Sequence, residues 1–271
     1  MFKRFFVFWM VFAMYAFATE ALKPVASPET SILIGGTAEL RDDTYSADMD
    51  MSLEVAPCRC LSIYADFSFR FLSYYWDTQW SDQSHDPLNL HVNGFNESYF
   101  GVKIFPIKYF GLALNWRALP GEGSQVNRFM RLGVEPMAVY PFSKNMNLGL
   151  SVGYYSFVER KNFQPGDELG AKASFTWKFL WHEYARTGWL MDYVFLYRTR
   201  IEDNENLNMQ KPFRKMDEVY DGFRMHAGIS RYFSWFPFPF ALGAAYEINR
   251  GYLFGFETGH RVELFLRSDL P

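Results

Sequence analysis

Long apolar runs are missing from most of this sequence. After Ala18 no uninterrupted apolar stretch approaches the length of about 20 residues that an α-helix needs to cross a bilayer. We therefore expect no membrane-spanning helix in that part of the chain. A strong excess of one charge is missing as well, because 27 Lys and Arg residues stand against 30 Asp and Glu residues. This balance argues against a nucleic-acid partner, which needs a basic surface.

Cysteine is also scarce. Only Cys58 and Cys60 occur, in the stretch Pro57-Cys-Arg-Cys60. The spacing is not C-x-x-C and no second pair completes a zinc site, so we expect neither a metal nor a cofactor. An exported protein meets oxidising conditions, but neighbours on one strand face are awkwardly placed for a disulfide. We interpret the two cysteines as residues of a short turn without a chemical role.

The one apolar run lies at the start of the chain. Lys3 and Arg4 precede thirteen apolar residues, Phe5–Phe17, and Ala16-Phe17-Ala18 has the small-x-small form of a cleavage site. The pattern predicts a secretory signal peptide over residues 1–18, because the run is too short for the rival reading, a membrane helix. No cysteine follows the cleavage point directly, so a lipoprotein anchor is not expected. Residues 19–271 are predicted to form a single barrel domain.

Aromatic residues are abundant, at 20% of the chain, yet the mean hydropathy is −0.17. The stretch Glu97–Arg117 shows how a chain rich in aromatic residues can have a slightly negative mean hydropathy. Phe100, Val102 and Ile104 alternate with small or charged residues, and the alternation resumes after a short corner. Period two on both sides of a tight connection predicts an antiparallel hairpin. One apolar face and one polar face per strand is the pattern of a transmembrane β-barrel.

The same alternation recurs along the chain and predicts about twelve strands, with ten or fourteen left open. Short corners follow the even-numbered strands up to the tenth, and the longest loops are Trp76–Asn93 and Glu202–Val219. This predicts a closed up-and-down antiparallel barrel with both termini on the periplasmic side. The predicted strands are Ile32–Arg41, Ala47–Ala56, Leu61–Tyr74, Phe100–Ile104, Leu112–Trp116, Phe129–Tyr140, Asn147–Phe157, Ala171–Phe179, Trp189–Arg200, Tyr220–Tyr232, Phe240–Asn249 and Phe254–Arg267.

Aromatic residues gather at the short corners, where we expect an interfacial girdle. The girdle candidates are Phe105, Tyr109, Phe110, Tyr140, Phe142, Trp181, Tyr184, Trp235, Phe236 and Phe238.

The last predicted strand carries a further signal. Glu257-Thr-Gly259-His-Arg-Val262-Glu-Leu264 is similar to the assembly signal of outer-membrane barrels, although the usual terminal aromatic is missing. With this signal the chain resembles the Gram-negative outer-membrane β-barrel superfamily. The resemblance implies a location in the cell outer membrane, with membrane lipids and the assembly machinery as partners. Twelve-stranded members include phospholipases, nucleoside channels and acidic-sugar porins, so the resemblance leaves the function and the oligomeric state open.

Three motifs contain residue types that occur in catalytic or metal-binding sites. Gly149-Leu-Ser151-Val-Gly153 matches G-x-S-x-G, but it lies inside an alternating strand, and we read its glycines as small lumen-facing residues. Lipid-cleaving barrels typically carry a His-x-Ser pair. None occurs here, and the nearest outward polar pair is Thr258 with His260. His85 and His91, near Asp82 and Asp86, are interpreted as residues of a solvated loop.

The predicted lumen carries acids and bases in near-equal number. A selective pore tends to have one dominant sign, so the balance favours mutual ion pairing and a narrow passage. Arg198, Arg200 and Arg224 form a basic ladder that is compatible with anion binding. We expect a non-enzymatic structural or surface-binding barrel; the alternatives are a porin-like channel for small polar or anionic solutes and a lipid-modifying hydrolase. The lumen candidates are Glu39, Arg41, Asp66, Arg70, Lys103, Arg117, Arg131, Glu135, Lys172, Asp192, Arg198, Arg200, Arg224, His226, Glu247, Arg261 and Glu263.

Overall fold

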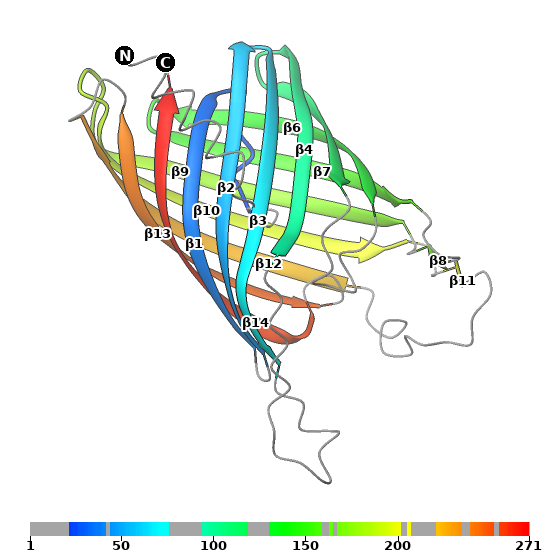
Figure 1. Cartoon of the computed structure of the whole chain (residues 1–271). Coiled ribbons are helices and arrows are strands. Elements are labelled where there is room, and N and C mark those ends of the chain that lie inside the picture. Colours follow the sequence, from blue (N-terminus) through cyan, green and yellow to red (C-terminus); the bar gives the residue numbers. More distant parts are fainter. Residues whose placement is uncertain are drawn as a thin grey trace, which may run out of the picture.

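The computed structural model is a closed β-barrel (Figure 1). It describes residues 22–41, 44–75, 94–118, 130–158, 163–164, 167–201, 205–206, 221–234, 239–251 and 255–270. The predicted signal peptide and the loop Trp76–Asn93 lie outside these residues, as does all of Glu202–Val219 except 205–206. Within the described residues no helix is long and apolar enough to span a membrane.

Twelve strands form the barrel, which confirms the predicted number. They are β1 (Thr30–Arg41), β2 (Thr44–Cys58), β3 (Leu61–Tyr75), β4 (Gly94–Ile107), β5 (Phe110–Ala118), β6 (Arg131–Ser143), β7 (Met146–Phe157), β9 (Glu168–His182), β10 (Thr187–Arg200), β12 (Asp221–Phe233), β13 (Phe240–Gly251) and β14 (Gly255–Leu270). Two short strands, β8 (Phe163–Gln164) and β11 (Glu205–Asn206), pair with each other outside the barrel sheet.

Antiparallel pairing runs from each barrel strand to the next and closes between β1 and β14. The closing register joins Thr30 to Leu270 at one end of the seam and Leu40 to His260 near the other. Closure leaves no unpaired edge, which a bilayer cannot solvate. The predicted closed antiparallel barrel is therefore confirmed.

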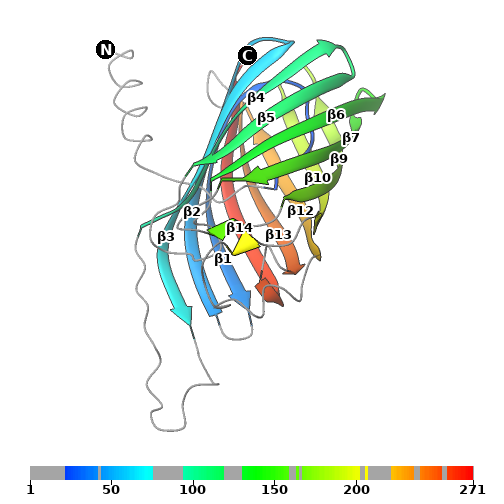
Figure 2. The same cartoon turned by 90° about the vertical axis from the view of Figure 1, so that its right-hand side faces the viewer.

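The two ends of the barrel differ. The described tight turns, such as Lys108–Tyr109 and Lys144–Asn145, lie at the end where β1 begins and β14 finishes. We call this the turn end; in barrels of this class it faces the periplasm. The opposite end, where β5, β9 and β10 meet the longer connections, is called the loop end. Figure 2 shows the strong tilt of the strands between the two ends.

Period two decides which side chains face outward. On β6 the inward residues are buried and the outward ones are exposed, from Arg131 and Leu132 to Val139 and Tyr140. β10 and β12 alternate in the same way. This outward apolar surface faces lipid, because large residues such as Ile63, Leu132 and Leu264 are more than half exposed on it.

The predicted girdle needs two corrections, at Phe105 and at Trp181, which is partly buried against Leu190, Tyr232 and Ala241. Phe110, Tyr140, Phe142 and Tyr184 are exposed near the turn end, as expected of a girdle. Phe105 instead points inward and is buried. Period two places Phe105 on the inward face with Gly101 and Lys103, and there it packs on an apolar patch inside the lumen. Residues Trp235, Phe236 and Phe238 lie outside the described residues.

The interpretation of the two cysteines also changes. The structure joins Cys58 and Cys60 by a disulfide, with their Cα atoms 5.4 Å apart. The turn between β2 and β3 allows it, because the chain bends between the two residues and they no longer lie on one straight strand face.

Candidate functional site in the barrel lumen

Most of the predicted lumen residues are buried on the inner wall. Arg41 ends β1, and its side chain lies outside the described part of the structure. Partly buried are Glu39, Arg70, Lys103, Lys172, His226 and Glu263. Buried are Asp66, Arg117, Arg131, Glu135, Asp192, Arg198, Arg200, Arg224, Glu247 and Arg261. The charges divide into two groups with different surroundings.

The first group lies on β1 to β3 and β12 to β14, which we call the paired wall. Here three arginines each donate to a carboxylate. Nε of Arg70 donates to Asp48 at 2.9 Å, and Nη2 of Arg261 donates to Asp50 at 2.5 Å. Arg224 donates from two nitrogens to Glu247, at 2.8 and 2.7 Å. Such charge-assisted contacts offset the cost of burying both charges.

Further ion pairs involve strands beyond the paired wall. Nε2 of His226 on β12 lies 3.0 Å from Oδ2 of Asp192 on β10. Lys103 of β4 donates to Glu54 of β2 at 2.7 Å, and Nζ of Lys172 on β9 lies 3.2 Å from Glu135 on β6. The last two pairs each reach past an intervening strand.

The second group lies at the loop end, on β5, β6, β9 and β10. Arg117, Arg131, Arg198 and Arg200 all interact electrostatically with the carboxylate of Glu168, and we call these five residues the arginine cluster. All five are buried. The charged groups of the arginine cluster are four guanidinium groups and one carboxylate. The cluster therefore has an excess of positive charge.

An aromatic ring organises the arginine cluster. The guanidinium carbons of Arg131 and Arg198 lie 4.6 and 4.5 Å from the ring centre of Tyr155. Both are close enough for cation–π attraction, which fixes the two side chains without neutralising them. Arg131 also lies 5.4 Å from the ring of Tyr99, and Arg117 lies 5.5 Å from the ring of Phe157.

Glycines make room for that ring. A Cβ atom added to Gly153 would lie 2.4 Å from the hydroxyl of Tyr155, and one added to Gly170 would lie 2.9 Å from its ring. Tyr155 therefore lies flat along the wall instead of projecting into the lumen. The sequence places these small residues at inward positions, as we read them in the G-x-S-x-G stretch, and Ser151 there donates a hydrogen bond to Glu135.

The chain before β1 also belongs to the lumen. Leu22 is buried against Val194 and Leu196 of β10. Val25 is buried with a second apolar group, formed by Phe105, Ala113, Met137 and Val139 of β4, β5 and β6. Residues 22–29, which we call the N-terminal segment, thus lie inside the barrel near its turn end (Figures 1 and 2).

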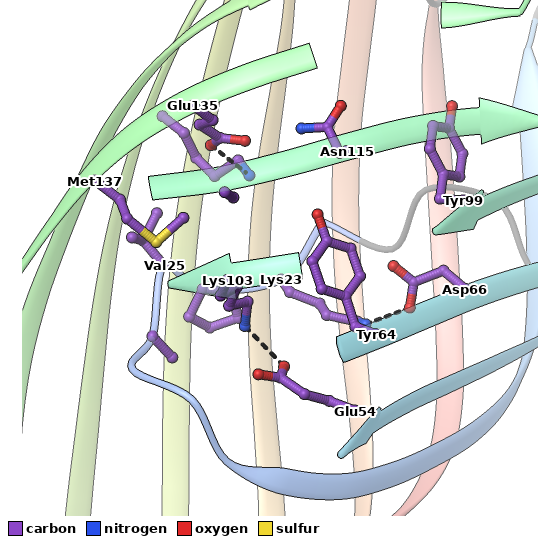
Figure 3. Close-up of a pocket in the computed structure, with 14 residues that line it drawn as sticks. Lys23, Val25, Glu54, Tyr64, Asp66, Tyr99, Lys103, Asn115, Glu135 and Met137 are labelled. Carbon is purple, nitrogen blue, oxygen red and sulfur yellow. Dashed lines mark hydrogen bonds and ion pairs between the residues drawn. The ribbon is translucent and has the colours of Figure 1, made fainter. Parts of the chain in front are cut away.

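Polar contacts hold the N-terminal segment in place. Lys23 forms an ion pair with Asp66 and a hydrogen bond with Ser52 (Figure 3). The backbone N–H of Val25 donates to the Ser174 hydroxyl at 2.8 Å, and Arg267 donates to Glu29 at 2.6 Å. The partners come from β2, β3, β9 and β14, on opposite sides of the barrel.

Two cavities flank this segment. One, of about 70 Å³, is lined by Lys23 and Val25 together with Tyr64, Lys103 and Glu135 (Figure 3). The other, of about 170 Å³, reaches His226 and Arg267 on the paired wall and Asp192 on β10. Both cavities are small and are lined by apolar as well as charged side chains, so the segment leaves only narrow space on either side of it.

The structure gives little support to the two other kinds of chemistry considered, lipid hydrolysis and metal binding. His260 faces outward, and its Nδ1 lies 2.6 Å from the hydroxyl of Tyr246. The described ranges contain no group of three His, Cys, Asp or Glu residues placed to hold a metal ion. His85 and His91 lie outside them.

Sequence reasoning missed three parts of the site. Glu168 and Tyr155 were not among the candidates, although Glu168 continues the period-two series of Gly170 and Lys172. The N-terminal segment precedes the first strand that the alternation predicts, which begins at Ile32. The signal for it was present: Leu190, Val194 and Leu196 are apolar residues at inward positions of β10, and such a patch needs a cover.

Comparisons with known proteins place the fold. No protein-family model matches the chain, and no curated protein matches it. Among solved structures, the NanC porin is similar with a TM-score of 0.57 at 8% identity, over 88% of this chain and 100% of the porin. The COG4313 outer-membrane channel from Pseudomonas putida F1 is similar with a TM-score of 0.60 at 8% identity, over 93% of this chain and 99% of that one. The chain has the fold of the outer-membrane β-barrel proteins, as its sequence predicted.

Proposed function

We propose that this protein is a non-enzymatic outer-membrane channel that passes small anionic solutes, with the arginine cluster as its selective region. The observation that carries the proposal is the set of four buried arginines around one carboxylate, Glu168. A lumen with low-dielectric walls concentrates ions whose charge is opposite to that of its lining. Carboxylates and phosphates suit guanidinium groups best, because the planar fork binds two oxygens at once.

The position of the cluster supports the same role. Its residues lie at the loop end of β5, β6, β9 and β10, where a solute from outside the cell first meets the inner wall. Tyr155 holds two of the guanidinium groups, those of Arg131 and Arg198, against the inner wall, where both side chains are buried. The fold neighbours are themselves a porin and a channel, a likeness of fold that agrees with the proposal.

The test is ion selectivity in a planar bilayer. Mature protein, refolded and shown to be folded by its faster migration before boiling, is placed in a potassium chloride gradient. We expect the reversal potential to indicate chloride preference. Arg198→Ala is expected to lower the chloride-to-potassium permeability ratio about fivefold, because one charge of the cluster is removed at short range.

Arg231→Ala is the matched control, because Arg231 lies near the turn end beside Trp189, on the outer face of β12. It is expected to leave the ratio unchanged. Equal ratios in the parent protein and in Arg198→Ala would overturn the proposed selectivity.

A second candidate is a structural or surface-binding barrel without a conducting state. The N-terminal segment favours it, because that segment and its ion pairs occupy the turn end of the lumen. Absence of any conductance steps from folded protein, in the parent and in the Lys23→Ala variant described below, would favour this candidate.

A further inference from the structure

We infer that the N-terminal segment is a gate: it closes the turn end of the lumen when seated and widens the passage when it withdraws. The inference rests on the proposed channel function for its conductance readout only. Its structural basis is independent, because it concerns where the segment lies and how weakly it is fixed.

The seat of the segment is specific. Val25 fits among Phe105, Ala113, Met137 and Val139, and its carbonyl lies so close to Gly149 that a Cβ atom there would approach it to 2.4 Å. Glycine at this inward position leaves the space that the segment fills. An inward apolar patch in an otherwise charged lumen is stable only when it is covered, and the segment covers it.

The attachment differs from that of a strand. The backbone–backbone hydrogen bonds found among the described residues, outside the regular strand pairing, include none from residues 22–29. Two described backbone N–H groups of the segment donate to barrel strands, and both partners are side chains: Val25 donates to the Ser174 hydroxyl and Glu29 donates to the Glu54 carboxylate. The segment is thus held by side chains, whereas β1 directly after it is bonded along its whole length to β2 and β14.

The ion pair between Lys23 and Asp66 holds the segment on the side away from Val25, and we call it the latch. Lys23 reaches Asp66 and Ser52, and these residues lie on β3 and β2, away from the apolar seat of Val25 (Figure 3). Beyond the latch, Glu29 meets Arg267 where β1 begins, so the segment is tethered at one end. A tethered segment with a single charged latch can leave its seat without disturbing the barrel sheet.

Withdrawal would change the passage. The cavities of about 70 and 170 Å³ share Lys23, Pro24 and Ala26 in their linings, so the segment is the partition between them. Without the segment the two cavities join into one space, lined by Lys103, Glu54 and the other charged residues that line either cavity. The open state is then a wider, polar lumen.

The first experiment measures accessibility and does not depend on conduction. Val25→Cys is placed in a Cys58→Ser, Cys60→Ser background of the mature chain, and its reaction with a membrane-impermeant maleimide is timed. The reference is Tyr184→Cys, at a fully exposed turn. We expect slow labelling at residue 25. Adding Lys23→Ala is expected to speed it about tenfold, the ratio expected when one charge-assisted hydrogen bond is lost. Lys144→Ala, at an exposed turn, is the matched lysine control and is expected to leave the rate unchanged.

The second experiment locks the gate. Val25→Cys and Ser174→Cys are combined in the same background, because the backbone nitrogen of Val25 and the Ser174 hydroxyl lie 2.8 Å apart. Under oxidation we expect a low conductance, and after reduction a return to that of the unlocked protein. Lys23→Ala alone is expected to raise the time spent in the larger conductance state.

The outcomes separate the two proposals. Labelling of residue 25 as fast as that of Tyr184→Cys in the parent chain would overturn the gate, because the segment would not be seated. Protected labelling that Lys23→Ala leaves unchanged would overturn it too, because the segment would be fixed. Faster labelling in Lys23→Ala with no conductance in any variant would support the moving segment and overturn the channel.

Discussion

On the paired wall Arg70, Arg224 and Arg261 each have a carboxylate within about 3 Å, whereas at the loop end four arginines interact electrostatically with one carboxylate, Glu168. The two regions belong to one sheet, and the arginine cluster is fully buried while Arg70 of the paired wall is only partly buried. They differ in what holds the guanidinium groups: carboxylates in one region, and in the other aromatic rings such as Tyr155. The comparison teaches that near-balanced lumen charge, counted over the whole chain, conceals a local separation of sign.

The separation has a physical consequence. A bidentate pair such as Arg224 with Glu247 directs its charges at each other and presents little field to a passing ion. A guanidinium that stacks on a ring keeps its positive charge, because the ring attracts it without supplying a negative charge. The paired wall is therefore expected to contribute mainly to stability, and the arginine cluster mainly to selectivity.

The largest effect on the unfolding free energy is expected from a substitution that removes an ion pair of the paired wall. Glu247→Ala should lower the free energy of unfolding by about 3–5 kcal/mol, because it leaves Arg224 buried without its carboxylate. Urea unfolding of protein refolded in lipid vesicles measures it. Glu247→Gln is the matched control and should cost less, since the amide oxygen still accepts a hydrogen bond. A loss below 1 kcal/mol in Glu247→Ala would mean that pairing does not stabilise this wall.

A smaller effect is expected from the ring of the arginine cluster. Tyr155→Leu should lower the free energy of unfolding by about 1–2 kcal/mol, because two cation–π contacts are lost. The same substitution should reduce chloride preference, since Arg131 and Arg198 lose their fixed positions. Tyr155→Phe keeps the ring and should leave both properties near those of the parent. If Tyr155→Phe matched Tyr155→Leu, the hydroxyl and not the ring would be what matters.

The smallest effect on the unfolding free energy is expected from an outward residue that belongs to neither region. His260→Ala removes an outward side chain that contacts Tyr246 on the lipid face, and it should change the unfolding free energy by less than about 0.5 kcal/mol. Conductance and selectivity should not change either. Loss of a measurable lipid-hydrolysing activity in this variant would instead revive the enzyme alternative, and mixed-vesicle lipid turnover is the measurement.

Alternation of side chains made the fold predictable. On β6, Leu132 and Val134 against Arg131 and Glu135 is enough to set the inward face, and the structure follows it. The number of strands and their closure followed from repeating this local pattern twelve times. Phe105 follows the same rule, since it shares the inward face of β4 with Gly101 and Lys103, but the alternation does not reveal that Val25 of the N-terminal segment packs against it.

The arrangement of the candidate site was harder to predict from the sequence than the fold. Arg198 and Arg131 were recognised as inward residues, but period two says nothing about which charges meet across the lumen. The meeting of Glu168 with four arginines depends on the register of β9 against β7 and β10, where Glu168 lies opposite Tyr155 and Arg200. Register is set by the whole closed sheet, so this cluster could not be derived from one strand at a time.

The N-terminal segment also bears on the order of assembly. Its partners, among them Asp66, Ser174 and Arg267, come together only once β14 has joined β1. An open sheet, as in a nascent or half-inserted chain, has no complete seat for Val25. Seating is therefore a late step that follows ring closure, and burial of residue 25 would report on the completion of folding in the membrane.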